Sequence, residues 1–476
     1  MSVWSSDTLV VIAERVNWNS GCLISIEILP AISAYLCDLC VNILATQLTQ
    51  RSQRYADIAE KNSIVMRLKL SIVLFVLLAP FYPTVGTWAG EERRVRPVQE
   101  RIRRVENGLV PLDQNRQPGQ PATLADRMQF YKVPGVSVAV VNRGEIQWAR
   151  GYGVLEAGST KPVTTETLFQ ACSITKGVTA VAVLALVQRK ELDLDEDVNK
   201  KLRTWKVPEN QFTKHEKVTL RRLLSHTAGV TVSGFRGYAT DEPVPTLLQI
   251  LQGIAPANSK PILVDITPGS QWRYSGGGFM ITQQLLMDVT GEQFPELMRR
   301  VVLQKVGMKD SLFEESLPKK RAARGHEESG QKIKGDWHVY PEMAAGGLWT
   351  TPTDLARLVI ELQRSKAGKS EKILSAQSTN EMFSGQMKDF PVAMVSQRYA
   401  RQITNQGIGF RLEGNGASAR FSHHGGNEGY RCFIVAYVNA TEGAIVMTNS
   451  DNGFELIQEI VRSIAKEYGW LDYPLT

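Results

Sequence analysis

The chain has 476 residues, of which 43% are hydrophobic and 22% are charged, the composition of a globular protein large enough for one extensive core or two lobes. The net charge is +7 at pH 7, and much of the basic excess lies in an arginine-rich run at residues 93–104. Because that run has no interleaved aromatic residues, and because the chain shows no recognition motif or phosphate-binding loop, we expect no nucleic-acid partner.

Residues 66–89 carry the parts of a secretory signal peptide. Met66-Arg67-Leu68-Lys69 is basic, LSIVLFVLLAP is apolar, and Thr87-Trp88-Ala89 resembles a cleavage site. The apolar run is shorter than the roughly 20 residues that a membrane-spanning helix needs. We therefore predict that Met66 is the true start, that residues 1–65 are an upstream extension, and that the mature protein is periplasmic or secreted. The alternative is a genuine N-terminal region with a short membrane anchor at 66–89.

Residues 90–120 are predicted to form a solvated basic helix or linker, and residues 121–476 the main domain. Strand patterns open and close this domain, and helical patterns fill its middle. We predict an α+β fold: an antiparallel sheet made from both chain ends, flanked by helices, with an inserted all-helical lobe. The expected elements are a helix at 123–131, a hairpin at 136–141 and 146–152, helices at 218–224, 279–289, 294–302 and 353–364, strands at 407–412, 430–438 and 444–449, and a final helix at 454–468.

Ser173 and Lys176 stand at the start of a strongly apolar run that predicts a buried helix. Three positions apart, their side chains share one helix face, so the ammonium group can reach the serine oxygen. The helix N-terminus adds unpaired N–H groups and partial positive charge where an oxyanion would form. The pattern therefore indicates a nucleophile for acyl transfer. The same spacing occurs at Ser316/Lys319 and Ser329/Lys332, where breaker residues predict loops, and an ordinary N-cap serine is the alternative at Ser173.

Two further motifs can supply partners for the serine. Tyr274 precedes a glycine run, and its phenol can relay a proton to or from a substrate. His424 precedes Gly425-Gly426-Asn427 before a predicted strand and can bind a substrate carboxylate or polarise the site. The backbone N–H of Asn427 can complete an oxyanion hole with that of Ser173. The alternatives are a tyrosine anchored in a turn and a structural histidine.

These three motifs resemble, in order and spacing, those of the penicillin-recognising serine hydrolases. The branch they resemble contains class C β-lactamases, penicillin-binding D,D-peptidases, D-aminopeptidases and related esterases, over about residues 121–470. The resemblance implies a β-lactamase/transpeptidase-like fold in which Ser173 forms an acyl-enzyme, and Lys176 and Tyr274 share its proton. It also implies that His424 stands where many relatives carry lysine, and that Gly426 keeps the strand open to substrate.

Gly276 departs from the family pattern, which often has asparagine at this substrate-binding position. Loss of that amide removes a hydrogen-bond donor for a β-lactam side chain and favours a general serine hydrolase acting on carboxylic esters or D-amino-acid peptides. The alternatives are a true class C-like β-lactamase and a non-catalytic binding or scaffold homologue.

We expect no cofactor and no metal, since His423 beside His424 lacks a third ligand for zinc. The remaining histidines are expected to be structural or surface residues (His215, His226, His326 and His338). Without the leader only Cys172 and Cys432 remain, which gives no disulfide framework. The expected partner is a small-molecule or peptide substrate, with membrane association only through residues 66–89.

Overall fold

The computed structural model describes residues 97–112, 122–313, 317–387 and 405–475, and a pair of two-residue strands near the N-terminus. These strands, β1 (Ser5–Ser6) and β2 (Leu9–Val10), pair antiparallel with each other. Apart from these four residues, the predicted extension at 1–65 and the predicted leader or anchor at 66–89 lie outside the described residues. Within the described parts of the chain, no helix is long and apolar enough to cross a bilayer.

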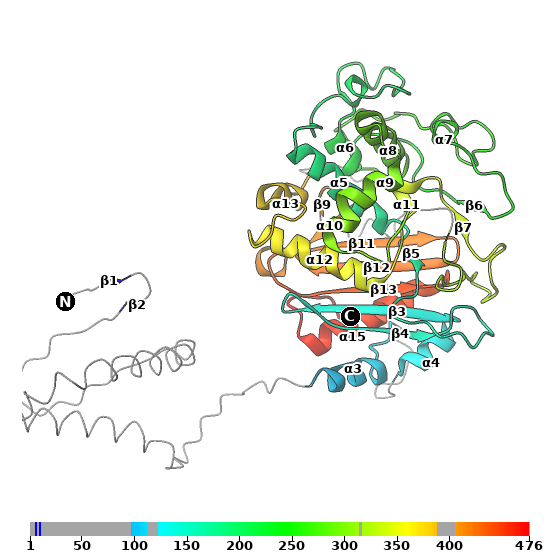
Figure 1. The fold of residues 1–476 in the computed structure, drawn as a ribbon, viewed down its shortest axis with the longest axis vertical. Helices are drawn as coiled ribbons and strands as arrows, with labels where there is room; N and C mark the ends of the chain where they lie inside the picture. Colours follow the sequence, from blue (N-terminus) through cyan, green and yellow to red (C-terminus); the bar gives the residue numbers. More distant parts are fainter. Residues whose placement is uncertain are drawn as a thin grey trace, which may run out of the picture. The chain divides into compact units, whose positions relative to one another are not determined.

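A seven-stranded antiparallel sheet forms the centre of the fold, in the order β4-β3-β13-β12-β11-β10-β9. Two strands come from the start of the domain and five from its end, which confirms the predicted sheet made from both chain ends (Figure 1). The strands are β3 (Gly135–Asn142), β4 (Glu145–Gly153), β9 (Asn405–Gln406), β10 (Arg411–Glu413), β11 (Arg420–Asn427), β12 (Tyr430–Tyr437) and β13 (Gly443–Thr448).

The inserted region between β4 and β9 is mainly helical rather than all-helical as predicted. It also contains two small two-stranded sheets, β5 with β8 and β6 with β7. Its elements are β5 (Phe169–Gln170), α5 (Ile174–Gln188), the 3-10 turn Val198–Lys200, α6 (Leu220–Leu224), β6 (Tyr238–Ala239), α7 (Leu247–Gln252), α8 (Gly277–Thr290), α9 (Phe294–Met298), the π-helical turn Arg299–Leu303, α10 (Gln304–Val306), β7 (His338–Val339), α11 (Met343–Gly346), β8 (Trp349–Thr350), α12 (Pro352–Lys366) and α13 (Ala376–Met382).

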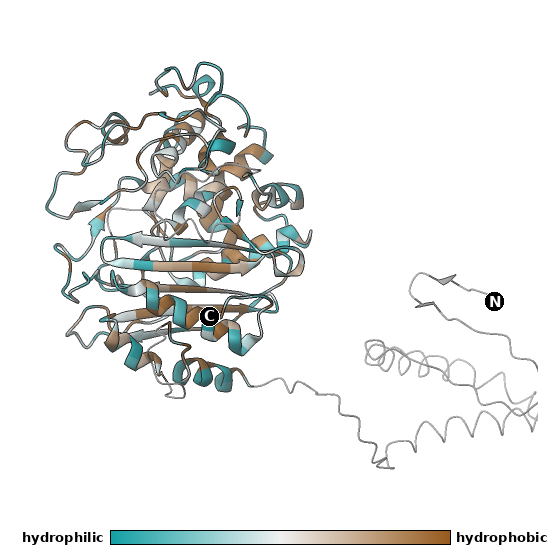
Figure 2. Cartoon of the chain, turned by 180° about the vertical axis from the view of Figure 1, so that it is seen from behind, coloured by the Kyte–Doolittle hydropathy of each residue, from teal (hydrophilic) through white to brown (hydrophobic). Residues whose placement is uncertain are grey.

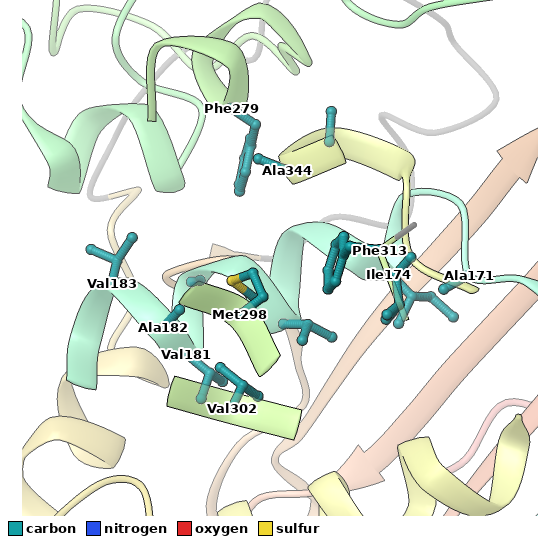
Figure 3. Packing of buried hydrophobic residues seen from close by; sticks show 14 of the residues in the cluster. Ala171, Ile174, Val181, Ala182, Val183, Phe279, Met298, Val302, Phe313 and Ala344 are labelled. Atoms are coloured by element: carbon teal, nitrogen blue, oxygen red, sulfur yellow. The ribbon is translucent and has the colours of Figure 1, made fainter. Parts of the chain in front are cut away.

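Helix α5 is the centre of the helical layer, because all its residues from Ile174 to Leu186 are buried. Side chains from α8, α9 and the π-helical turn surround it, among them Phe279, Met298 and Val302 (Figure 3). A helix that is apolar on every side is stable only where neighbours cover it all round. Its first turn is therefore held rigidly at the boundary between the helical layer and the sheet.

The opposite face of the sheet is covered by α15 (Gly453–Tyr468), which buries one apolar stripe and leaves a polar one outside. Figure 2, a view from behind, shows hydrophobic and hydrophilic residues along this helix. Two more helices join this layer, α3 (Val98–Asn107) and α4 (Leu124–Phe130). The two faces thus have separate cores.

The described part of the predicted basic helix or linker, residues 97–112, packs onto the domain rather than forming a solvated linker. In α3, Ile102 and Val105 are buried against the α15 layer. Glu106 accepts hydrogen bonds from Arg150 at 2.8 Å and Tyr152 at 3.0 Å, both on β4. The folded domain therefore begins before residue 121.

Candidate active site

Ser173 stands at the N-terminus of α5, directly after a strained turn. The chain leaves β5 through Cys172, whose φ of +49° is in the left-handed region that a residue with a side chain rarely adopts. Hydrogen bonds from Ile174 N–H to Ala171 and from Thr175 N–H to Cys172 close the first turn. This geometry places the half-buried Ser173 at the N-terminus of α5, where the helix dipole contributes partial positive charge.

Lys176 is the immediate partner of Ser173. Its Nζ donates to Ser173 Oγ at 3.0 Å and to the carbonyl oxygen of Ala345 at 2.8 Å, and the side chain is only 3% exposed. A second serine–lysine pair at this spacing, Ser329 and Lys332, makes different contacts. Ser329 Oγ accepts from Gln331 N–H in a turn, and Lys332 pairs with acidic side chains. The Ser316 copy lies outside the described residues. Unlike Ser329, Ser173 is therefore in contact with the lysine three positions later.

Helix α11 supports this pair from the opposite side. Besides the Ala345 carbonyl held by Lys176, the Ala344 carbonyl accepts from Thr179 at 3.0 Å. The N–H of Ala344 in turn donates to Gln283 of α8 at 2.9 Å. Helix α11 is thus fixed between α5 and α8, and its hydrogen bond to Lys176 holds that side chain beside Ser173.

Tyr274 completes the predicted cluster from the loop before α8. Its ring centroid lies 5.2 Å from Lys176 Nζ, 4.4 Å from the ring of His226 and 6.3 Å from that of His423. The fold therefore brings Ser173, Lys176 and Tyr274 together from segments far apart in sequence. The alternative of a tyrosine merely anchored in a turn does not explain this convergence.

His424, predicted as a site residue, points to the wrong side of the sheet. Its ring stacks on Phe433 with centroids 4.2 Å apart and lies 5.8 Å from Phe454 of α15. The neighbouring His423 pairs with Ile434 and faces Tyr274 instead. The prediction placed this motif before a strand, whereas β11 already begins at Arg420, and side chains alternate along a strand. Of these two adjacent histidines, His423 is therefore the one on the Tyr274 side of the sheet.

Gly426 was predicted to keep the strand open to substrate, but the same alternation of side chains places it on the other face of the sheet, where it is exposed. A Cβ added there would meet only the Arg431 side chain, at 3.6 Å or more. A Cβ at Gly425 would lie 2.3 Å from Cys432 Sγ and 2.8 Å from the carbonyl oxygen of Ala171. Gly425, rather than Gly426, therefore allows β11 to approach the Ser173 turn.

Asn427, predicted to supply an oxyanion N–H, ends β11 next to the Ser173 turn. Its side-chain amide donates to Gln170 Oε1 at 2.7 Å and to the carbonyl oxygen of Gly346 at 3.2 Å. These bonds tie the strand end to β5 and α11. The backbone of Asn427 is thus fixed beside the elements that carry Ser173 and hold Lys176.

Gly276 is buried and does not offer a free backbone group to a substrate. Its N–H donates to the carbonyl oxygen of Ser233 at 3.1 Å. A Cβ at this position would lie 2.9 Å from the ring of Phe235. A side chain at position 276 would therefore collide with the ring of Phe235. That ring occupies the space into which a substrate-binding side chain at this position would project.

Two buried histidines surround Tyr274, and both are held in the neutral form. Burial lowers the pKa of His226 and of His423 well below the usual range, and the charges of Lys176 and Arg411 lower both further. From the sequence, His226 is expected to be a structural or surface residue; the structure buries it with its ring 4.4 Å from that of Tyr274. Among the described residues no three metal-ligating side chains come together.

A serine in hydrogen-bond contact with a buried lysine, at the start of a helix under an antiparallel sheet, is an arrangement typical of serine acyl-transfer proteins. The beta-lactamase family model matches residues 121–466. The chain therefore belongs to the beta-lactamase family, as the motifs predicted.

Several relatives share part of the chain. Penicillin-binding protein 4 of Amycolatopsis lactamdurans is 25% identical over 72% of this chain and 88% of its own length. Esterase EstB of Burkholderia gladioli is 28% identical over 43% of this chain and 53% of its own. Protein flp of Staphylococcus aureus is 24% identical over 48% of this chain, and the match spans only 43% of that protein's length.

Solved structures show the same fold. The octameric penicillin-binding protein homologue of Pyrococcus abyssi superimposes with a TM-score of 0.59 at 23% identity, over 73% of this chain and 76% of that one. A D-amino acid amidase of Ochrobactrum anthropi gives 0.57 at 22% identity, over 73% of this chain and 96% of that one. These likenesses confirm the predicted β-lactamase/transpeptidase-like architecture.

Proposed function

We propose that the protein is a serine acyl hydrolase that works through an acyl-enzyme on Ser173. The observation that carries this proposal is the 3.0 Å contact of Lys176 Nζ with Ser173 Oγ at the start of a buried helix, with the ring of Tyr274 5.2 Å from the same ammonium group. A structural N-cap serine needs neither partner, and Ser173 makes no side-chain capping bond.

In the proposed reaction the Ser173 hydroxyl loses its proton to the Lys176–Tyr274 pair while its oxygen bonds to the substrate carbonyl carbon. The carbonyl π electrons move to oxygen, and the backbone N–H of Ser173 stabilises that charge. Collapse of the intermediate breaks the bond to the leaving group, which takes the proton through Tyr274. Water then attacks the acyl-enzyme, releases the carboxylic acid and restores the serine.

We propose carboxylic esters or D-amino-acid peptides and amides as the substrate class, in preference to β-lactams. The ring of Phe235 covers the side of Gly276 from which a residue at that position would project. The acyl side of the site thus lacks an amide donor there and has an apolar wall, which suits a simple acyl group better than a β-lactam side chain. A relative named as an esterase and a neighbour named as an amidase are consistent with this choice.

The test is an intact-mass time course of the protein with benzylpenicillin and, separately, with p-nitrophenyl esters and D-amino-acid p-nitroanilides. We expect acyl adducts on Ser173 and turnover of an ester or anilide. Ser173→Ala should lower that turnover at least about 1,000-fold, and Ser329→Ala should leave it unchanged. Rapid consumption of benzylpenicillin would establish the β-lactamase alternative, and turnover that survives Ser173→Ala would refute the mechanism.

We also propose that the mature protein acts outside the cytoplasm after removal of residues 66–89. The basic, apolar and cleavage-site segments of that stretch support the proposal. N-terminal sequencing of the native protein should give a start near Gly90. A start within residues 1–65 would instead favour the anchored alternative.

A further inference from the structure

We propose that His226 is a positioning residue that holds Tyr274 in place for proton transfer. The inference rests on the proposed function of the Ser173 site. It concerns a buried histidine that lies in a different loop from Tyr274.

His226 makes hydrogen bonds to both chain neighbours of the tyrosine. Its carbonyl oxygen accepts from the N–H of Arg273 at 2.8 Å, and its Nδ1 accepts from the N–H of Ser275 at 3.2 Å. Tyr274 lies between these two donors, and its ring is 4.4 Å from the imidazole with the planes tilted by 40°. One residue therefore fixes the backbone on each side of Tyr274 and also limits the rotation of its ring.

The loop that carries His226 is itself rigid. His226 has a φ of +61°, a conformation that costs energy for a residue with a side chain and persists only where its surroundings enforce it. The N–H of Thr227 donates to the carbonyl oxygen of Arg222 at 2.8 Å. The N–H of Gly269 donates to the carbonyl oxygen of Thr227 at 2.7 Å. The strained backbone directs both acceptors of His226 toward the tyrosine loop.

The Ser275 bond needs an unprotonated Nδ1, because a protonated nitrogen cannot accept a hydrogen bond. His226 is 2% exposed, and the ammonium of Lys176 disfavours a second positive charge close by. Arg411 acts in the same direction, and the nearby His423 is also neutral. The site therefore maintains the form of His226 in which Nδ1 can accept the hydrogen bond.

Two substitutions separate the acceptor from the ring. Asparagine tolerates the left-handed backbone and can offer Oδ1 at the place of Nδ1, whereas leucine fills similar space without an acceptor. In single-turnover acylation we expect His226→Leu to slow the chemical step about 10- to 100-fold with KM changed less than about 3-fold. We expect His226→Asn to recover the rate to within about 5-fold of wild type.

Ile250→Ala is the control for lost stability, because Ile250 is fully buried in the same layer on α7. Assayed at a temperature where all variants are folded, Ile250→Ala should keep the wild-type acylation rate. The proposal is overturned if His226→Leu acylates at the wild-type rate, if His226→Asn is as slow as His226→Leu, or if Ile250→Ala is equally slow. Activity that persists in Ser173→Ala would instead refute the proposed function, independently of His226.

Discussion

The two faces of the central sheet treat a pair of adjacent histidines in opposite ways. His423 faces the helical layer, where Tyr274, His226 and Lys176 converge. His424 faces α15, where it stacks on Phe433 and its Nδ1 is buried without a hydrogen-bond partner. One face thus gathers polar side chains around a serine, and the other uses a histidine as part of an apolar core.

Strand geometry alone makes this difference. Successive side chains on β11 point to opposite faces, so His423 and Gly425 belong to the Ser173 side and His424 and Gly426 to the α15 side. Substitution of two identical, adjacent residues of β11 is therefore expected to have different effects on activity and stability. The following predictions test this division.

The largest effect is expected for the glycines of β11. Gly425→Ala places a methyl group against Cys432 Sγ and the Ala171 carbonyl, so the Ser173 turn must shift. We expect at least a 100-fold loss of esterase or amidase activity and a loss of stability of about 1–3 kcal/mol. Gly426→Ala should stay within about 3-fold of wild type. Equal losses in the two variants, measured by steady-state kinetics and thermal unfolding, would contradict the assigned register.

The histidines should differ next. His423→Leu removes a buried polar group that lies near Tyr274, and we expect kcat/KM to fall about 10- to 100-fold. His424→Leu should leave kcat/KM within about 3-fold, because the side chain faces α15. A larger kinetic loss for His424→Leu than for His423→Leu would restore the original assignment.

Acid stability should depend on the α15 face. Burial lowers the pKa of His424 from 6.5 to about 3, so the folded protein binds fewer protons than the unfolded chain between these values. The contribution of neutral His424 is fully present above pH 6.5 and is lost as the pH falls toward 3. In thermal unfolding, His424→Phe should narrow the difference in Tm between pH 7 and pH 4.5 by about 3–5 °C. His215→Phe, at an exposed position, serves as the control and should not narrow it.

The smallest effect concerns the helical layer over the site. Burial raises the pKa of Glu342 from 4.5 to about 7, and the neighbouring Tyr238 hydroxyl and backbone N–H offset only part of that rise. The contribution of protonated Glu342 to the free energy of unfolding is therefore fully present below pH 4.5 and is lost as the pH rises through 7. We expect Glu342→Gln to raise Tm by about 1–3 °C at pH 8 and to leave it unchanged at pH 4.5. A change of equal size at both pH values would show that ionisation is not the cause.

The sequence by itself determined the main features of the fold and the contact between Ser173 and Lys176. The apolar run after Ser173 predicted a buried helix, and the spacing to Lys176 placed both side chains on one face because the helical repeat is a local property. Strand patterns at both chain ends predicted the sheet, and motif order indicated Tyr274. These features depend on residues close in sequence or on patterns that recur in a family.

Only the tertiary structure decided which of the two adjacent histidines faces Tyr274, which glycine lets β11 approach the Ser173 turn, and which ring lies beside Gly276. Register depends on where β11 begins, and a shift of one residue reverses every side chain. The contact of Phe235 with Gly276 and the hydrogen bonds of His226 to the flanks of Tyr274 join separate loops, whose meeting is set by packing of the whole domain. Such contacts leave no local periodicity, and for that reason the sequence could not specify them.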